Sequence, residues 1–389
     1  MAKLKVTFVV NHAAFFVSHR LPIALGARKA GYEVALLTGQ AGSVLMEKPA
    51  VATLTAQQLL HQRVAFRSAS VNPLLELLGL VQLAWRMHQL RPDIVHCASP
   101  KGLLYGGLAA RLCGVKALVL AVSGMGFAFT SSGKHSLLRT VIAKIYRSLV
   151  GIAFGHKNLQ VIVQNRDDKA LLIANGMVRP DQITLIPGSG VDLKAFMSMS
   201  IENKLPVVLL PARMLLDKGV IEFVEAARVL KASAPEWRFV LAGAADYYNP
   251  SSVSSEQIEA WQREGVVEWL GHVDDINPWF SQASIVCLPS YREGMPKALL
   301  EAAAAGCAVV TTDTTGCREA IIIGETGDLV PVRDSVTLAT VLLALMQDRS
   351  RRERYGYAGR KLAIERYGID AVVKTTLEIY QSLLNQKYL

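Results

Sequence analysis

Short, strand-like apolar runs alternate with helical patterns along this sequence, and the alternation occurs twice. The runs of the first half are Lys5–Val10, Glu33–Thr38, Asp93–Cys97, Ala117–Val122 and Gln160–Gln164. Those of the second half are Val207–Leu210, Arg238–Ala242, Val266–Leu270, Ile285–Leu288 and Ala308–Thr311. Gly, Pro or polar residues bound each run, as in parallel strands that are buried on both sheet faces and joined by crossover helices. The pattern therefore predicts an α/β chain with two Rossmann-like, doubly wound domains that face each other across a cleft.

The polar stretch 198–204 separates the two sets of strands and is interpreted as a linker. A chain of 389 residues is long enough for two domains, each with its own core. We expect the first domain over residues 1–197 and the second over residues 205–366. The segment 367–389 has a helical pattern, and we expect a C-terminal helix that could cross back to the first domain.

The composition excludes several classes of protein. A hydrophobic content of 51% with 19% charged residues does not fit a disordered chain. The five cysteines form no C-x-x-C pair, which gives no support to a disulfide framework or a zinc site and fits a reducing cytoplasm. No window approaches the roughly 18–20 uninterrupted apolar residues of a membrane-spanning helix. We therefore expect a cytoplasmic protein that is not integral to a membrane.

Charge is unevenly distributed along the chain. Residues 1–200 contain 22 Lys and Arg against 8 Asp and Glu, whereas residues 201–389 contain 20 against 24. A basic half predicts an anionic partner such as nucleic acid, a phospholipid surface or a phosphorylated substrate. Aromatic and basic residues do not interleave as they do in a platform for nucleic-acid bases, so no nucleic-acid partner is expected.

The segment 284–310 reads as a strand, a tight loop, a helix, a glycine stop and a second strand. Glu293 and Gly294 would lie where the first strand ends and the helix begins, with Pro296 in the first helical turn. Free backbone N–H groups at such a position favour an anion, and glycine lets a phosphate or a sugar approach closely. Glu301 follows roughly one turn into the helix, so the two carboxylates could accept hydrogen bonds from different hydroxyl groups of one ligand.

A second cluster of polar residues follows the first strand of the second half. Arg213 supplies a planar set of donors and Lys218 a mobile positive charge, a pair suited to a diphosphate. Gly219 then opens a helical pattern, Val220–Leu230. The predicted sheet places this cluster and the Glu293 segment at the same edge.

The two clusters resemble the signature of glycosyltransferase family 4, a large retaining family with the GT-B fold. The matching residues are Arg213, Lys218, Gly219, Glu293 to Pro296 and Glu301. The segment Leu270–Val273 is similar to the family's segment against the nucleotide base. Three segments of the first half resemble bacterial enzymes that extend polyprenyl-diphosphate-linked oligosaccharides: Ser18–Pro22, Ser99–Lys101 and Val122–Gly126.

This resemblance implies a function for each domain. The second domain would bind a nucleotide-sugar and the first domain the acceptor. The enzyme would move a hexose or N-acetylhexosamine from a UDP-sugar to a membrane-bound, polyprenyl-diphosphate-linked saccharide. Such a reaction belongs to the assembly of a bacterial surface polysaccharide, such as lipopolysaccharide or capsule. An α-linked donor would give an α-linked product, because the family is retaining.

The resemblance also assigns site residues. Arg213, Lys218 and Glu293 would be catalytic, the first two on the donor diphosphate and the third on the hydroxyl groups of the donor sugar. Glu301 would hold the ribose, and the backbone near Val273 the base. The rest of the donor site would comprise Gly294, Met295, Pro296 and Leu299. The acceptor side would include Phe16, His19, Lys101 and Gly124.

Two departures limit the assignment of roles. Many members of the family have a histidine where this sequence reads Ser123-Gly124, so no first-domain side chain receives a catalytic role. The sequence also contains no D-x-D motif. Fixed cations and helix amides would then neutralise the leaving diphosphate, a role that a metal fills in other transferases. We expect no metal and no cofactor, the UDP-sugar being a substrate.

Other activities remain as alternatives. A UDP-sugar 2-epimerase shares the two-domain architecture but would need acid–base carboxylates and histidines around the sugar. A glycosyltransferase with a soluble acceptor is also open. A nicotinamide dehydrogenase would show G-x-G-x-x-G after the first strand, where this chain reads Val10-Asn-His-Ala-Ala-Phe15.

The segment Ser136–Phe154 bears on where the enzyme works. Its apolar residues form one helical stripe, with Arg139, Lys144 and Arg147 off the stripe. An ordinary helix packed on the first sheet is one interpretation. The other is a helix in the headgroup region of an anionic membrane, which would make the enzyme peripheral on the inner face of the cytoplasmic membrane.

Overall fold

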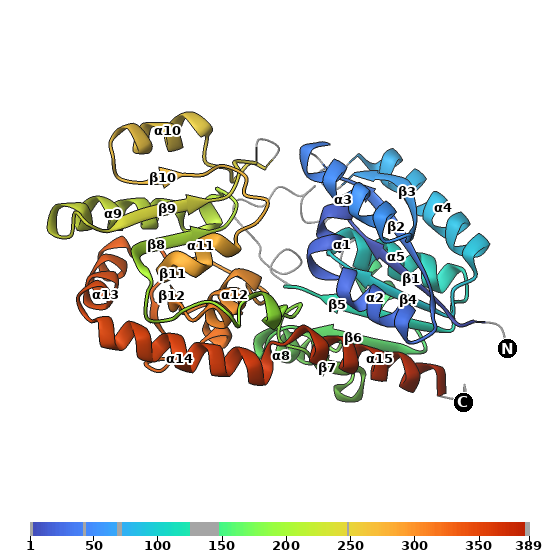
Figure 1. Cartoon of the computed structure of the whole chain (residues 1–389). Helices are drawn as coiled ribbons and strands as arrows, with labels where there is room; N and C mark the ends of the chain where they lie inside the picture. The colour runs from blue at the N-terminus through green and yellow to red at the C-terminus, as the bar shows by residue number, and fades with distance from the viewer. Residues whose placement is uncertain (1–2, 42–43, 68–71, 125–147, 247–248, 386–389) are drawn as a thin grey trace. The chain divides into compact units, whose positions relative to one another are not determined.

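The computed structural model describes residues 3–41, 44–67, 72–124, 148–246 and 249–385. The chain divides into two compact units (Figure 1). Unit 1 comprises Met1–Ser189 together with Asp370–Leu389, and unit 2 comprises Gly190–Ile369. The last segment of the chain therefore belongs with the first unit.

Unit 1 is built on a parallel sheet that has seven strands within the described residues. Their order is β3 (Leu60–Arg67), β2 (Glu33–Gln40), β1 (Lys5–Val10), β4 (Ile94–Ala98), β5 (Ala117–Val122), β6 (Leu159–Val163) and β7 (Ile183–Leu185). The helices named within the described residues are α1 (Ala13–His19), α2 (Leu21–Lys29), α3 (Val44–Ala56), α4 (Pro73–Leu90), α5 (Pro100–Leu112), α8 (Arg166–Ala174) and α15 (Ile369–Asn385), and residues 148–154 are also helical.

Each face of this sheet carries its own apolar core, since successive side chains of a strand point to opposite faces. Val9, Leu37 and Val95 lie in one core with residues of α4 and α5. Phe8 and Leu36 lie in the other, with residues of α1, α2 and α15. The inner strands β1, β4, β5 and β6 are consequently apolar almost throughout, as expected for a parallel sheet covered on both faces, whereas the edge strand β3 also carries polar residues.

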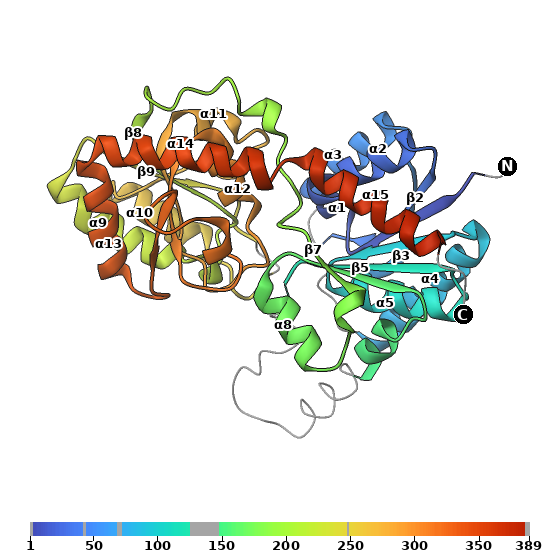
Figure 2. The same ribbon diagram turned by 90° about the horizontal axis from the view of Figure 1, so that it is seen from below.

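Helix α15 is part of the second of these cores. Figure 2 shows it beside α2, and the two helices pack closely enough that a Cβ on Gly26 would clash with Val373. Tyr380 of α15 is fully buried, and its hydroxyl lies 2.6 Å from Nδ1 of His96 on β4. Residues from the two ends of the sequence thus complete one core.

Unit 2 repeats the same design. In the part of the chain that the structure describes, its parallel sheet has six strands. The order is β10 (Glu268–Trp269), β9 (Arg238–Ala242), β8 (Leu205–Pro211), β11 (Ala283–Leu288), β12 (Ala308–Thr312) and β13 (Gly327–Val330). The helices are α9 (Val220–Ser233), α10 (Ser255–Arg263), α11 (Asn277–Gln282), α12 (Lys297–Ala305), α13 (Ser335–Gln347) and α14 (Arg349–Arg366).

The predicted fold class is confirmed, because each unit is a doubly wound α/β sheet. Lys5–Val10, Ala117–Val122 and Arg238–Ala242 are strands with the predicted bounds. The sequence analysis missed β3, β7 and β13. The strand predicted over residues 266–270 is shorter in the structure, where Glu268–Trp269 pairs with β9.

Candidate active site

The order of strands in unit 2 reverses between β8 and β11. Strands β9 and β10 continue to one side of β8, and β12 and β13 to the other side of β11. In a doubly wound sheet, a ligand-binding crevice forms beyond the carboxyl ends of the strands at such a switch point. The segments that follow β8 and β11 contain all three of the residues predicted to be catalytic: Arg213, Lys218 and Glu293.

Lys218 and Glu293 are brought together at this point. The Lys218 ammonium lies 2.5 Å from Oε1 of Glu293, and the two side chains are only 17% and 16% exposed. Gly219 makes this approach feasible. It has a φ of 71°, and a Cβ at that position would clash with the carbonyl oxygen of Pro289. The conformation of a single glycine therefore allows the loop after β8 to lie against the loop after β11.

The loop that carries Glu293 is held from two sides. The Ser290 hydroxyl shares its single hydrogen between two acceptors, Oε1 of Glu293 at 3.0 Å and the carbonyl oxygen of Asp217 at 2.9 Å. On the other side, the Glu293 N–H donates to the carbonyl oxygen of Thr315 at 3.2 Å. Gly316, with a φ of 78°, lies so close that a Cβ would clash with the carbonyl oxygens of Glu293 and Gly294. Neighbouring loops thus hold the backbone at Glu293, and the side chains of Ser290 and Lys218 hold its carboxylate.

Tyr291 ties the same loop to α9. Its N–H donates to the carbonyl oxygen of Asp217 at 2.8 Å, and its hydroxyl donates to the buried Glu222 carboxylate at 2.6 Å. Burial and the hydrogen bond to Glu222 raise the pKa of Tyr291 to about 12. The guanidinium of Arg333 lies over the ring, 4.8 Å from its centre. Sequence patterns gave no indication of these contacts, because they join residues of separate loops and helices.

Glu301 lies on α12, close to the start of that helix. Burial raises the pKa of its carboxyl group, while the Lys297 ammonium, 3.2 Å away, acts in the opposite direction. The position predicted for Pro296 needs correction. Pro296 is the N-cap with extended backbone, and the helix begins one residue later, at Lys297. Its ring therefore precedes the first turn, to which it contributes no polar side chain.

Arg213 has a different environment from Lys218. Its guanidinium donates to Asp246 at 2.8 Å, and its side chain is 51% exposed. Asp246 follows β9, the strand next to β8, so this pair also lies at the carboxyl edge of the sheet. The structure provides no direct contact between Arg213 and Lys218.

The remaining donor-site candidates divide into backbone and core positions. Met295 and Leu299 are buried in the core under α12, at 7% and 0% exposure. Only their backbone groups are therefore available to a ligand. Val273 is half-buried against the same core. Gly294 lies between Glu293 and this buried pair.

Unit 1 has its own switch point, between β1 and β4. Here the side-chain oxygen of Asn11 accepts hydrogen bonds from the Ser99 hydroxyl at 2.8 Å and from the N–H groups of Lys101 and Gly102 at 3.0 and 3.1 Å. Ser99 has a φ of 68°, a strained conformation for any residue other than glycine. The first amides of α5 are thus bound by a side chain of the protein itself.

The acceptor-side candidates occupy dissimilar positions in unit 1. Phe16 is fully buried and packs edge-to-face on Phe8, so its side chain has no surface for a ligand. His19 is half-buried and stacks on Phe15. Lys101 lies 2.6 Å from Glu76 in a mostly buried ion pair. Gly124 has a φ of 126° and is followed by residues 125–147, which lie outside the described part of the chain.

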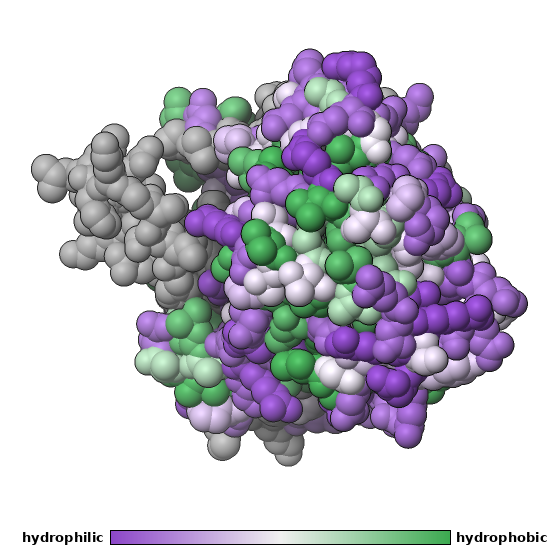
Figure 3. Space-filling view, turned by 90° about the vertical axis from the view of Figure 1, so that its left-hand side faces the viewer, coloured by the Kyte–Doolittle hydropathy of each residue, from purple (hydrophilic) through white to green (hydrophobic). Residues whose placement is uncertain are grey.

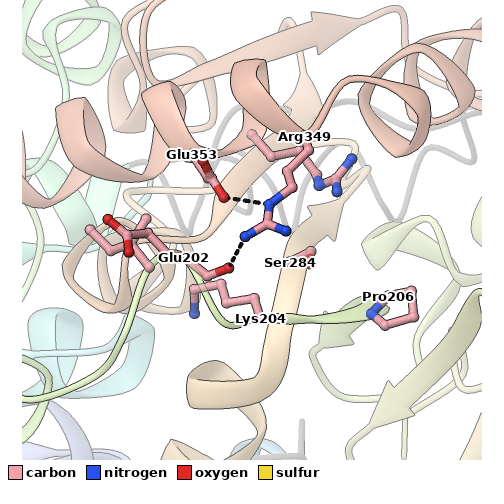
Figure 4. Close-up of a pocket in the computed structure, with 9 residues that line it drawn as sticks. Glu202, Lys204, Pro206, Ser284, Arg349 and Glu353 are labelled. Carbon is pink, nitrogen blue, oxygen red and sulfur yellow. Dashed lines mark hydrogen bonds and ion pairs between the residues drawn. The ribbon is translucent and has the colours of Figure 1, made fainter.

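A small pocket of about 130 Å³ in unit 2 lies at the opposite edge of the sheet (Figure 4). It is lined by Lys204, Ser284, Arg349 and other residues near the amino ends of β8 and β11. Its polar groups already bind one another. Arg349 donates to Glu353 at 2.7 Å and to the carbonyl oxygen of Glu202 at 2.9 Å, as Figure 4 shows. The candidate site is therefore the one at the carboxyl edge.

Among the described residues, His, Cys, Asp and Glu form no group of three that could hold a metal ion. All five cysteines are free thiols. Over the same residues, no helix combines the length and the apolar character needed to cross a bilayer.

Comparison with known proteins gives matches to both units. A sequence profile described as "Glycosyl transferase 4-like" matches residues 5–165, and one described as "Glycosyl transferases group 1" matches residues 205–348. The N,N'-diacetylbacillosaminyl-diphospho-undecaprenol alpha-1,3-N-acetylgalactosaminyltransferase of Campylobacter jejuni subsp. jejuni serotype O:2 is 30% identical over 333 residues. These cover 82% of this chain and 85% of that protein.

Two further matches agree with these. The UDP-Gal:alpha-D-GlcNAc-diphosphoundecaprenol alpha-1,3-galactosyltransferase of Escherichia coli is 25% identical over 293 residues, 72% of this chain and 73% of that protein. The crystal structure of Anabaena HepE in complex with UDP superimposes with a TM-score of 0.72 at 18% identity, over 97% of this chain and 100% of that chain. At that identity, the structural match shows the fold alone.

Proposed function

The chain belongs to glycosyltransferase family 4, and on this premise we propose that it transfers a hexose or N-acetylhexosamine from a UDP-sugar to a polyprenyl-diphosphate-linked saccharide. The expected family, its GT-B fold and the transferase activity are confirmed, and the comparisons support a transferase and not a 2-epimerase. The acceptor is inferred from the relatives in C. jejuni and E. coli, whose names both specify an undecaprenyl-diphosphate-linked sugar. Transfer to such an acceptor would be a step in the assembly of a bacterial surface glycan.

The observation that carries the proposal is the Lys218–Glu293 pair at the switch point of unit 2. A UDP-sugar bound there would offer its diphosphate to Lys218 and its sugar hydroxyl groups to Glu293. The ion pair would then be exchanged for two charge-assisted contacts with one ligand. Ser290 and Tyr291 keep the loop in place while this happens, because their hydrogen bonds run to Asp217 and Glu222.

Other residues at the carboxyl edge of the unit 2 sheet would also contact the UDP-sugar. Arg213 would reach the diphosphate from its exposed position, and Glu301 would bind the ribose. The backbone of Gly294 to Pro296 would line the sugar, and the backbone near Val273 would contact the base. Transfer breaks the bond between the anomeric carbon and the diphosphate, so negative charge develops on UDP as it leaves. Lys218 and Arg213 would stabilise that charge without a metal ion.

We propose in addition that the enzyme works at a membrane surface. The acceptor is a lipid, and unit 1 carries 23 Lys and Arg against 9 Asp and Glu. Such a surface would attract the anionic inner face of the cytoplasmic membrane, with each cation near it contributing on the order of 1 kcal/mol. The helix predicted over Ser136–Phe154 mostly lies outside the described residues, as do its cations Arg139, Lys144 and Arg147.

The proposed reaction is tested by measuring UDP release from a panel of UDP-sugars, each with and without short-chain polyprenyl-diphosphate-linked mono- and disaccharides. We expect release to depend on one lipid-linked acceptor, with a glycosylated lipid as the product. Nuclear magnetic resonance of that product should show an α-linkage from an α-linked donor. Release that depends only on a soluble saccharide would replace the proposed acceptor, and a β-linkage would overturn retention.

A further inference from the structure

Helix α4 of unit 1 has two apolar faces, and within the described residues only one of them packs against the core. Leu83 and Met87 are fully buried against β3, and a Cβ on Gly79 would lie 2.9 Å from atoms of Phe66. The other face carries five large apolar side chains that are between 48% and 78% exposed. These residues, called the α4 stripe below, are Leu74, Leu77, Leu78, Val81 and Trp85. Their spacing of three and four residues places them along one side of the helix.

A contiguous exposed stripe of this kind indicates contact with a partner, because single exposed apolar residues are ordinary but aligned ones are not. The helix that carries the stripe lies beside β3, the edge strand of the unit 1 sheet (Figure 1). It is a ridge and not a groove. The acyl region of a lipid bilayer is deformable and apolar, so it can surround such a ridge without offering a complementary pocket.

The charges around the stripe favour an anionic partner. Glu76 is the one acidic residue in the sequence of α4, and the Lys101 ammonium 2.6 Å away neutralises it. The guanidinium of Arg86 lies 4.7 Å from the centre of the Trp85 ring. Beyond Trp85, exposed His88 and Arg91 line a hollow of about 380 Å³ at the end of α4.

A second copy of the chain fits the stripe less well. Unit 1 has 14 more cations than anions, so two such surfaces would repel each other at low ionic strength. An anionic phospholipid surface has the opposite charge and an apolar interior. Tryptophan beside a cation is suited to the boundary between these two regions, because its ring is apolar and its N–H is polar.

We infer that the α4 stripe is the surface through which unit 1 inserts into an anionic phospholipid bilayer. The five apolar side chains enter the boundary between headgroups and acyl chains, and Arg86 and Arg91 remain among the phosphates. This inference deepens the proposed membrane location and names a contact surface of described residues. It rests on the proposed function only in that a lipid-linked acceptor gives the enzyme a reason to be there.

Trp85 provides a direct test on the wild-type protein, since the other four tryptophans of the sequence lie in unit 2. The difference between the emission of wild type and of Trp85→Phe isolates its signal. With vesicles of phosphatidylglycerol and phosphatidylcholine, we expect this signal to shift to shorter wavelength. Vesicles with brominated acyl chains should quench it. Bound protein whose Trp85 signal is neither shifted nor quenched would overturn the inference.

A pair of double variants tests the same surface by substitution. Leu77→Glu/Val81→Glu places two charges on the stripe, and we expect its partition onto these vesicles to fall about tenfold or more. The matched control is Val229→Glu/Val336→Glu in unit 2, where both side chains are also exposed, at 66% and 76%. Figure 3 shows a face of unit 2 on which apolar groups lie among hydrophilic ones. The control should partition within twofold of wild type.

The outcomes separate the inference from the proposed function. Equal partition of both double variants would overturn the α4 stripe as the contact surface. Loss of a dimer in sedimentation velocity, instead of loss of vesicle binding, would assign the stripe to a second copy. Vesicle binding through α4 without transfer to any lipid-linked saccharide would leave the inference standing and remove the proposed acceptor. Circular dichroism and UDP binding would verify that Leu77→Glu/Val81→Glu is folded.

Discussion

The two sheets of this enzyme have the same topology around their switch points but opposite chemistry there. In unit 1, the loops after β1 and β4 are joined by uncharged groups, Asn11 with Ser99 and the first amides of α5, and the nearby Lys101 ammonium is paired with Glu76 of α4. In unit 2, the groups that meet between β8 and β11 are an ammonium and a carboxylate, Lys218 and Glu293. The first edge is closed by its own hydrogen bonds. The second holds two charges that a ligand can separate.

This difference shows that topology determines where a site can form but not whether the edge is open to a ligand. In unit 1, the strained backbone of Ser99 accompanies the hydrogen bonds that close the carboxyl edge of the sheet. In unit 2, the glycines Gly219 and Gly316 let loops approach one another at positive φ without strain.

The largest effect should come from Lys218→Ala. This substitution leaves the mostly buried Glu293 carboxylate without its cation and removes the proposed contact to the diphosphate. A charge-assisted hydrogen bond is worth roughly 1.5–3 kcal/mol, so we expect kcat/KM for transfer to fall about a hundredfold. Arg228→Ala is the control, since it breaks an ion pair of unit 2 in which both side chains are 44% exposed. Steady-state kinetics at the wild-type level for Lys218→Ala would remove this pair from the active site.

Arg213→Ala should have a smaller effect, about tenfold in kcat/KM, because the Arg213 side chain is half exposed and its contacts are weakened by solvent. Asp246→Asn is the companion variant. It frees Arg213 from its partner without removing the guanidinium, so activity should change less than in Arg213→Ala. If Asp246→Asn lost as much activity as Arg213→Ala, the ion pair itself would be the functional unit.

Acid should weaken unit 1 before unit 2. Burial holds the pKa of His96 well below 6.5, and nearby Arg20 adds to the depression. The folded state therefore keeps this imidazole neutral while the unfolded chain takes up a proton below about pH 6.5. Because the unfolded state binds more protons, the free energy of unfolding falls as pH drops, on the order of 1 kcal/mol for each unit below 6.5.

Hydrogen exchange measured by mass spectrometry at pH 7.5 and 5.5 would follow each unit separately. After correction for intrinsic exchange, protection should fall more in peptides of unit 1. Burial also lowers the pKa values of His61 and His156, both in unit 1. The one histidine of unit 2 is the exposed His272. Equal loss of protection in the two units would contradict this account.

The smallest effect on transfer should come from removing divalent metal ions with a chelator. The sequence has no D-x-D motif, and we assign charge neutralisation of the leaving UDP to Lys218 and Arg213. Transfer measured in excess EDTA should then stay close to the untreated rate. A complete loss that added Mg²⁺ reverses would show that a metal ion performs the role given to these cations.

Local sequence patterns predicted the strands around the site better than the side-chain contacts within it. The alternation of apolar runs gave three strands with the observed bounds, because buried parallel strands are apolar almost throughout. The strand β3, Leu60–Arg67, was missed because its sequence includes His61, Gln62 and Arg63. The pairing of Lys218 with Glu293 was not predictable from spacing, since 75 residues separate them and the conformation of Gly219 decides it.

The α4 stripe was missed for a related reason. Its sequence is apolar around most of the helix, and only the packing of Leu83 and Met87 on β3 reveals which side is left uncovered. The charge pattern pointed instead to the basic segment 136–154 as the membrane surface. Among the acceptor-side candidates, Phe16 has its side chain in the core of unit 1, because an apolar residue after a strand is as readily a core residue as a site residue.

The position of α15 also has consequences for how the protein is made. The face of the unit 1 sheet that includes Phe8 is completed by Tyr380 and its neighbours on α15. A ribosome adds roughly 5–20 residues per second, so roughly 10 s or more pass between the end of unit 1's first segment at Ser189 and the synthesis of this helix. Unit 2 is synthesised during that time, while the older unit presents an apolar surface to chaperones and proteases. A frameshift late in the gene would thus damage the half of the protein that was translated first.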